Sequence, residues 1–132
     1  MGTEVIMILR LLLAAALGAI IGYQRERAGK PAGLRTHTLI CLGAALFTIA
    51  SIYGFGGVNP AQVAAGIVAG IGFLGAGAIL HRQGGIVIGL TTATTMWAVA
   101  AIGLTAGAGL YLLSAVTTVV VLIILLLPHP IR

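Results

Sequence analysis

The sequence is poor in charged residues, and above all in acidic ones. Its 132 residues include seven lysines and arginines but only two acids, Glu4 and Glu26, whereas 60% of the residues are hydrophobic. The surface of a soluble domain of this size is normally rich in charged side chains, and so few charges could not cover it. The composition therefore excludes a soluble globular domain and predicts an integral membrane protein.

The chain also lacks the residue groupings that most enzymes need. Its single cysteine, Cys41, cannot form an internal disulfide, and neither a paired-cysteine motif nor an HExxH motif occurs. No nucleophile stands beside a base and an orienting group, and no second carboxylate accompanies Glu26. We therefore expect no catalytic residues, no bound metal and no cofactor.

Residues 70–75 read Gly-Ile-Gly-Phe-Leu-Gly and match the dinucleotide-binding pattern G-x-G-x-x-G. That pattern works after a strand, with an acidic residue about 20 positions later to hold the ribose. Here the glycines lie inside the apolar run 61–80, and no acid follows Glu26. The run is long enough to cross a bilayer, which takes about 20 apolar residues. The glycines are therefore interpreted as helix-packing positions.

Five apolar segments, separated by turn or charge signals, predict an all-α integral membrane protein: a compact bundle of about five transmembrane helices. They cover approximately residues 5–23, 37–53, 61–80, 86–104 and 110–127. The polar stretch 24–36, with Pro31 between glycines, is expected to be irregular, and Pro60 suits the first turn of the third helix. No cleavable signal peptide is evident. We expect residues 1–132 to form one transmembrane domain, without a soluble C-terminal domain.

The charges between these segments predict the orientation. The loop after the first segment carries Arg25, Arg27, Lys30 and Arg35, the loop after the third carries Arg82, and the loops after the second and fourth carry none. The positive-inside rule then places the N-terminus outside and the C-terminus, with Arg132, in the cytoplasm. Topology and anionic lipid explain the net charge of +5 better than nucleic acid does. The expected partner is the lipid bilayer, with no nucleic acid.

Glycines four residues apart recur along the chain. The pairs are Gly18 with Gly22, Gly66 with Gly70, Gly85 with Gly89, and Gly103 with Gly107. Such pairs let two membrane helices approach to backbone contact. In the third segment we expect five helix-packing glycines, namely Gly66, Gly70, Gly72, Gly75 and Gly77. One face is expected to serve a second subunit, which favours a homo-oligomer, most simply a dimer.

The polar stretch after the first segment holds the first candidate functional residues, Arg25, Glu26 and Arg27. Glu26 is the only acid on the predicted cytoplasmic side. An ion pair with Arg25, Arg27 or Arg35 is a better interpretation than a Mg²⁺ or Ca²⁺ site, because such sites gather several oxygen ligands. For the two neighbouring arginines, contact with lipid headgroups is an equally good interpretation.

A threonine-rich stretch at residues 91–95 is the second candidate. Thr91 and Thr95 lie four apart on one helix face, and with Thr92 they predict a polar stripe directed inward. Bonding of some hydroxyls to their own helix is the alternative. Arg10 is expected to extend toward the outer interface, and His81 to lie at the interface.

Three stretches, taken in order and with their spacing, resemble the MgtC/SapB family of bacterial inner-membrane proteins. They are residues 25–27 continuing through 32–37, residues 70–77, and residues 89–93 continuing to Trp97. The resemblance covers nearly the whole chain and adds His37 to the candidate cluster. This cluster comprises Arg25, Glu26, Arg27, Arg35, His37, Thr91, Thr92 and Thr95. Departures from the family pattern are Gln24, Asn59, Gln62 and Ile88, which stand where charged residues are expected.

The resemblance implies a multi-pass protein of the bacterial inner membrane that is tied to growth in low magnesium, acid tolerance and virulence. It also implies regulation of other membrane proteins, ATP synthase among them. We therefore expect a regulator of magnesium or proton homeostasis that acts through contacts between membrane proteins. A small cation transporter or channel is the main alternative, with a path formed by Thr91, Thr92 and Thr95 and by the glycine backbone near Gly75 and Gly77. A structural subunit of a membrane assembly is the third.

Overall fold

A computed structural model describes residues 2–56, 59–81 and 87–128 of the chain. Arg82, Gly85, Ile86 and Arg132, which entered the predictions above, lie outside these ranges. The described residues form five helices and one small pair of strands. The helices are α1 (Thr3–Arg27), α2 (Leu34–Tyr53), α3 (Pro60–Ala78), α4 (Leu90–Gly107) and α5 (Tyr111–Leu125), and the strands are β1 (Leu80–His81) and β2 (Val87–Ile88). The prediction of an all-α membrane bundle is confirmed.

In the described part of the chain, four helices, α1 to α4, are long and apolar enough to cross a bilayer. The fifth, α5, has 15 residues. At 1.5 Å per residue it extends about 22 Å, which is shorter than the roughly 30 Å hydrocarbon core. The fifth span was predicted from the apolar run 110–127, which has 18 residues, but α5 begins and ends inside that run. The crossing of the bilayer by α5 remains a prediction.

The polar stretch expected to be irregular is partly helical, because α1 continues to Arg27. Its end is closed by two backbone hydrogen bonds of 3.0 Å, from the N–H of Lys30 to the carbonyl of Arg25 and from the N–H of Gly29 to the carbonyl of Glu26. Gly29 has φ of +71°, the left-handed conformation that this type of helix end requires. Helical geometry thus fixes the directions of Arg25 and Arg27, which a loop would leave open.

The third and fourth helices are both shorter at their facing ends than predicted. α3 ends at Ala78, and the residues after it form β1, which pairs antiparallel with β2: Leu80 lies opposite Ile88 and His81 opposite Val87. Pro60 occupies the first turn of α3, as predicted. Gly89, with φ of +91°, turns the chain from β2 into α4. The strand pair therefore takes residues that the hydropathy pattern had assigned to membrane helices.

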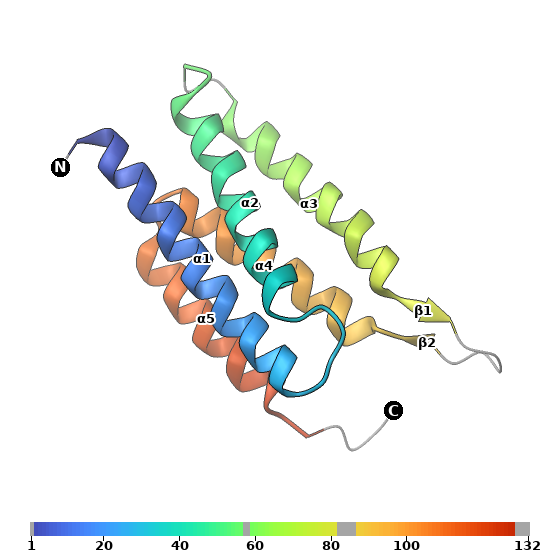
Figure 1. The fold of residues 1–132 in the computed structure, drawn as a ribbon. Coiled ribbons are helices and arrows are strands. Elements are labelled where there is room, and N and C mark those ends of the chain that lie inside the picture. The colour runs from blue at the N-terminus through green and yellow to red at the C-terminus, as the bar shows by residue number, and fades with distance from the viewer. Residues whose placement is uncertain (1, 57–58, 82–86, 129–132) are drawn as a thin grey trace.

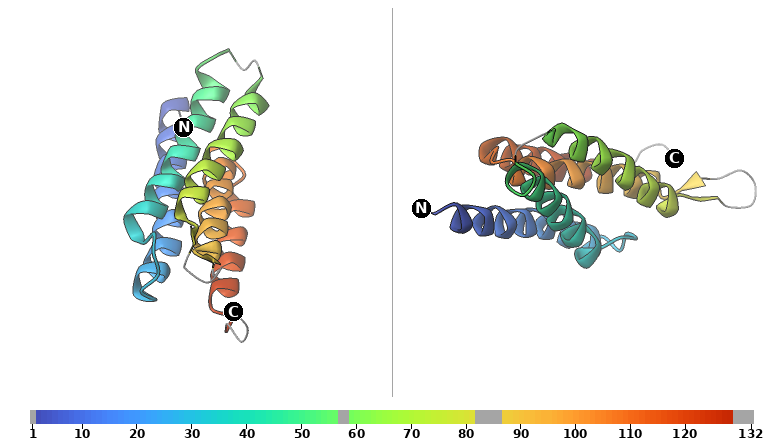
Figure 2. Two further views of the ribbon diagram at one scale, coloured as in Figure 1. Left: turned by 90° about the vertical axis from the view of Figure 1, so that its right-hand side faces the viewer. Right: turned by 90° about the horizontal axis from the view of Figure 1, so that it is seen from above.

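The helix α4 lies at the centre of the bundle and packs against each of the other four helices. In Figure 1, α1 and α5 lie on one side and α3 on the other, with α2 and α4 between them; Figure 2 shows the same bundle from two further directions. The main core gathers small and branched apolar side chains from α1, α2 and α4: Ala14, Leu17, Ile21, Cys41, Ala45, Val99, Ile102 and Ala106. Only 11% of the most apolar stretch of α3 is buried inside the chain, against 50% for α4. The helix α3 is thus the least enclosed of the long helices.

Candidate functional site

One end of the bundle holds most of the predicted polar residues. The C-terminal end of α1 lies beside the start of α2, because a Cβ on Gly22 would meet Leu34, and α4 runs parallel to α2, because Gly103 and Gly107 lie against Cys41 and Ala45. The end of α1 and the beginnings of α2 and α4 therefore meet (Figure 1). We name this region the basic end, after Arg25, Arg27, Lys30 and Arg35.

The structure brings Arg25 and Thr92 together across 67 positions of sequence. Nη2 of Arg25 donates a hydrogen bond of 2.7 Å to Oγ1 of Thr92, which joins the last turns of α1 to the first turn of α4. Both side chains are buried, with exposed fractions of 4% and 2%. Nε of Arg25 is also buried and has no hydrogen-bond partner among the described residues. An unsatisfied buried donor costs roughly 1–3 kcal/mol, and more when it is charged.

His37 lies in the first turn of α2 and is fully buried. Its Nδ1 is 3.0 Å from the carbonyl oxygen of Gly33. Because a carbonyl can only accept, we assign the proton to Nδ1, which leaves Nε2 as an acceptor. Nε2 is buried without a partner among the described residues. The basic end thus holds two buried side chains that each retain an unused polar atom.

The threonines of α4 divide into two kinds. The hydroxyl of Thr95 donates to the carbonyl of Thr91 at 2.7 Å, and the hydroxyl of Thr94 donates to the carbonyls of Leu90 and Thr91 at 3.1 and 3.0 Å. These bonds stay within the helix, as the alternative interpretation held. Thr92 instead accepts a bond from α1. The hydrogen bond between α1 and α4 is therefore made by Thr92, and not by the predicted stripe of Thr91 and Thr95.

Glu26 does not form the ion pair expected of it. Its Oε1 accepts a hydrogen bond of 3.1 Å from the backbone N–H of Leu34, the first residue of α2. The first N–H groups of a helix have no partner inside the helix, and a carboxylate beside them is favourable. Glu26 therefore caps α2 from the end of α1. Because the cap belongs to a neighbouring helix, spacing in the sequence gave no sign of it.

The two remaining arginines of the cluster lie on the surface. Arg27 is exposed, donates a hydrogen bond of 3.2 Å to the hydroxyl of Tyr23, and lies over its ring at 5.8 Å. Arg35 is also exposed. Of the eight candidate residues, four are buried: Arg25 and Thr92 are joined by a hydrogen bond, whereas His37 and Thr95 bond to carbonyls of the backbone.

Arg10 forms a second polar cluster at the opposite end of α1, which the sequence reasoning missed. Nε donates to the hydroxyl of Tyr111 and Nη1 to the hydroxyl of Tyr53, both at 2.9 Å, and Nη1 also reaches the carbonyl of Gly107 at 3.3 Å. Arg10 thus reaches the last residue of α2 and the first residue of α5, where protein groups hold its side chain, and its extension toward the outer interface of the bilayer remains a prediction. The signal available in the sequence was a tyrosine at the end of the second segment and another at the start of the fifth.

Two of the predicted glycine pairs lie where helices touch. A Cβ on Gly18 would come within 2.8 Å of the carbonyl oxygen of His37, one on Gly22 within 2.8 Å of Leu34, and one on Gly107 within 2.6 Å of the carbonyl oxygen of Ala45. Gly103 meets the carbonyl oxygen of Cys41 in the same way. These pairs allow the close crossing of α1 over α2 and of α4 over α2.

The glycines of α3 behave differently. A Cβ on Gly66, Gly70, Gly72 or Gly77 would meet nothing within 4 Å among the described residues, and one on Gly75 would make an ordinary contact of 3.5 Å with Ala93. Among the described residues, the predicted packing is therefore found at Gly75, which lies against α4, and not at the other four glycines. A contact with a second subunit remains a prediction.

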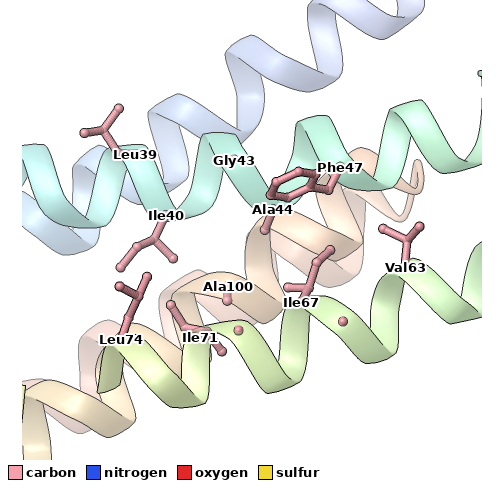
Figure 3. Close-up of a pocket in the computed structure, with 12 residues that line it drawn as sticks. Leu39, Ile40, Gly43, Ala44, Phe47, Val63, Ile67, Ile71, Leu74 and Ala100 are labelled. Atoms are coloured by element: carbon pink, nitrogen blue, oxygen red, sulfur yellow. The ribbon is translucent and has the colours of Figure 1, made fainter. Parts of the chain in front are cut away.

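A groove of about 570 Å³ separates α2 from α3, with Ala100 of α4 at its floor. Gly66 and Gly70 belong to its lining, and Figure 3 shows side chains such as Phe47 and Leu74 along its two walls. All of its lining residues are apolar. The groove therefore offers no ligands to an ion.

Comparison with known proteins identifies close relatives of the chain. A model of the MgtC family matches residues 11–132. The chain is 48% identical to the "Putative magnesium transporter YhiD" of Escherichia coli (strain K12) over 92% of its own length and 60% of the relative's. It is 47% identical to "Protein MgtC" of Brucella abortus over 89% of its length and 49% of the relative's, and 45% identical to "Protein SrpB" of Synechococcus elongatus over 83% and 67%. The chain thus spans about half to two thirds of these relatives, and no solved structure matches it.

Proposed function

The chain belongs to the MgtC family, and from that premise we propose that it is a multi-pass protein of the bacterial inner membrane that regulates magnesium homeostasis. It acts through contacts with membrane proteins and does not itself carry the ion. The name of one relative, a putative magnesium transporter, leaves both roles open. The chemistry of the interior favours the regulator.

The observation that carries this proposal is the sign of the buried charge. The ionised side chain enclosed at the basic end is a cation, Arg25, which repels Mg²⁺. Magnesium is bound in proteins through oxygen ligands, usually one or two carboxylates with water. Glu4 lies in the first turn of α1 and Glu26 at its last, so the two acids are at opposite ends of the helix. In the described part of the chain, no three His, Cys, Asp or Glu side chains are grouped to hold a metal ion.

The hydroxyl groups of the bundle also favour a regulator. Thr48 and Thr118 are buried, and each donates to a carbonyl one turn back on its own helix. Thr95 does the same in α4. A cation path needs several oxygens that converge on a shared space, and the bonds of these hydroxyls hold each oxygen against its own helix. The groove beside α3, which is lined only by apolar residues, offers no side-chain oxygens for that path.

The working surface of the proposed regulator is the exposed part of the basic end. Arg27, Lys30 and Arg35 are exposed there. The orientation with the N-terminus outside places this surface in the cytoplasm, where it meets lipid headgroups and the cytoplasmic faces of partner proteins. Glu26 orders the surface because it fastens the start of α2 to the end of α1.

Transport by proteoliposomes tests the proposal. Uptake of Mg²⁺, Na⁺ and H⁺ is measured for the wild-type chain and for Glu26→Gln, with Glu4→Gln as the matched control at the other end of α1. We expect no uptake above that of empty liposomes from any of the three. In cells lacking the native protein, Glu26→Gln should lose support of growth at limiting magnesium, whereas Glu4→Gln should keep it. Robust wild-type uptake that Glu26→Gln abolishes would overturn the regulator in favour of a carrier.

A further inference from the structure

The basic end concentrates positive electrostatic features without a matching negative group. α2 begins there at Leu34 and α4 at Leu90, and the first turn of a helix presents free N–H groups and a partial positive charge. Glu26 covers the first N–H of α2. The cap residue of α4 is Gly89, which has no side chain to accept from the first turn. The beginning of α4 therefore lacks a side-chain cap.

Arg25 adds a full positive charge at this same helix beginning. Its guanidinium reaches Thr92 in the first turn of α4, although cations are favoured at the opposite, C-terminal end of a helix. The side chain is 4% exposed, and Nε has no acceptor among the described residues. Nε and the adjacent terminal nitrogen form the edge of a guanidinium that binds an oxyanion through two parallel hydrogen bonds. In Arg25, the terminal nitrogen Nη2 bonds to Thr92, whereas Nε has no partner among the described residues.

The charged groups nearby do not balance Arg25. Glu26 is the one acid at this end, and its carboxylate lies on the N–H of Leu34. Arg27 and Arg35 add further exposed positive charge. A buried charge is normally paired or fully hydrogen-bonded, because water no longer solvates it. The missing partner of Arg25 should therefore be an anion from outside the chain.

We propose that the basic end binds one phosphate-type oxyanion between the guanidinium of Arg25 and the first turn of α4. The oxyanion accepts from the Nε edge of Arg25 and from the uncapped N–H groups of α4, an arrangement that suits phosphate at a helix N-terminus. Leu90, at the start of this turn, is 60% exposed, so the helix end lies at the surface, whereas Arg25 and Thr92 are buried below it. The same chemistry is offered by free inorganic phosphate and by the headgroup of an anionic lipid. The site is independent of the proposed regulatory function, because binding is measured without any assay of that function.

Thermal stability of the purified full chain in neutral detergent tests the site. Inorganic phosphate is compared with chloride at equal ionic strength, and phosphatidylglycerol with phosphatidylcholine. Arg27→Gln is the control for charge, because it removes one exposed positive charge two residues further along α1 and leaves the buried guanidinium of Arg25 in place. The Tm of the wild-type chain and of Arg27→Gln should rise with a phosphate ligand, whereas that of Arg25→Gln should not. A rise with inorganic phosphate identifies the free anion as a ligand, and a rise with phosphatidylglycerol alone identifies the lipid headgroup.

A second variant keeps the test decisive if Arg25→Gln does not fold. Arg25→Lys retains the charge but cannot form two parallel hydrogen bonds. It should therefore bind whichever phosphate ligand raised the Tm of the wild-type chain about tenfold more weakly, as measured by titration calorimetry. The proposed site would be excluded by the absence of any rise in Tm for the wild-type chain. An equal rise in the Arg25 and Arg27 variants would exclude it as well.

Discussion

Nε of Arg10 donates a hydrogen bond of 2.9 Å to the hydroxyl of Tyr111, a residue 101 positions further along the chain. The same guanidinium lies over the rings of Tyr53 and Tyr111, at 5.6 and 5.7 Å from their centres. It joins α1 to the end of α2 and to the start of α5. With its bond to the carbonyl of Gly107 at the end of α4, this one side chain links four helices at the end of the bundle opposite Arg25.

Replacement of Arg10 should loosen that end of the bundle. Arg10→Gln removes both tyrosine hydrogen bonds, whereas Tyr111→Phe removes one and keeps the ring. Since a hydrogen bond contributes about 0.5–1.5 kcal/mol, we expect Tyr111→Phe to lower the free energy of unfolding by roughly 1 kcal/mol and Arg10→Gln by more. Unfolding in detergent, followed by tryptophan fluorescence of Trp97, measures the difference. Equal stability of the wild-type chain and Arg10→Gln would show that the hydrogen bonds of Arg10 do not stabilise the bundle.

Loss of the hydroxyl of Thr92 should destabilise the protein without a change of shape. Thr92→Val keeps the volume of the side chain but leaves Nη2 of Arg25 without its acceptor. We expect a loss of about 1–3 kcal/mol in the free energy of unfolding. Thr94→Val is the control, because Thr94 is exposed and bonds only to its own helix. A loss as small as that of the control would mean that Arg25 finds another acceptor.

Glycines that look alike in the sequence should respond differently to substitution. A side chain at Gly103 would push against the backbone carbonyl of Cys41, which cannot move aside as a flexible side chain would. Gly103→Leu should therefore lower the free energy of unfolding by about 1–3 kcal/mol or prevent folding. Gly70→Leu should change stability little, because nothing in the described chain lies within 4 Å of the added carbon.

The variant Gly70→Leu also tests the predicted homo-oligomer. Size-exclusion chromatography with light scattering compares the oligomeric state of the wild-type chain and Gly70→Leu. A change of state in Gly70→Leu at unchanged helix content would support a second copy on α3. If the state is unchanged, no close contact between subunits occurs at Gly70.

The orientation is tested by labelling of single cysteines. In a Cys41→Ala background, a cysteine at Phe55 should react with a membrane-impermeant thiol reagent applied outside the cell, and one at Lys30 should not. Both positions are exposed, so each is open to the reagent on its own side. The reverse pattern would place the basic end outside.

The sequence was sufficient to predict the helices, because the length of an apolar run decides whether it crosses a bilayer. It could not predict which polar residue lies inside. Arg25 and Arg27 flank the same glutamate, yet one is buried and the other exposed. Two residues apart on a helix, they point in directions about 200° apart, and this distinction exists only because α1 continues to Arg27.

The glycines show the other limit of prediction. Gly66 with Gly70 and Gly103 with Gly107 share the same spacing, but only the second pair meets a backbone. The difference depends on which helix lies opposite, and that is a property of the whole arrangement. The partners of Arg10 and Glu26 were missed for the same reason, since each lies on another helix.

Because α4 packs against all four other helices, the bundle cannot complete its packing until α4 has been synthesised. The first three helices leave the ribosome before α4, but they cannot enclose Arg25 or cover the carbonyls of Cys41 and Ala45 without it. Until residues 90–107 are made, Arg25 lacks its acceptor Thr92, and α1 and α2 lack the helix that packs against both of them. The main core takes Val99, Ile102 and Ala106 from α4, so it can close only after the fourth helix has been synthesised.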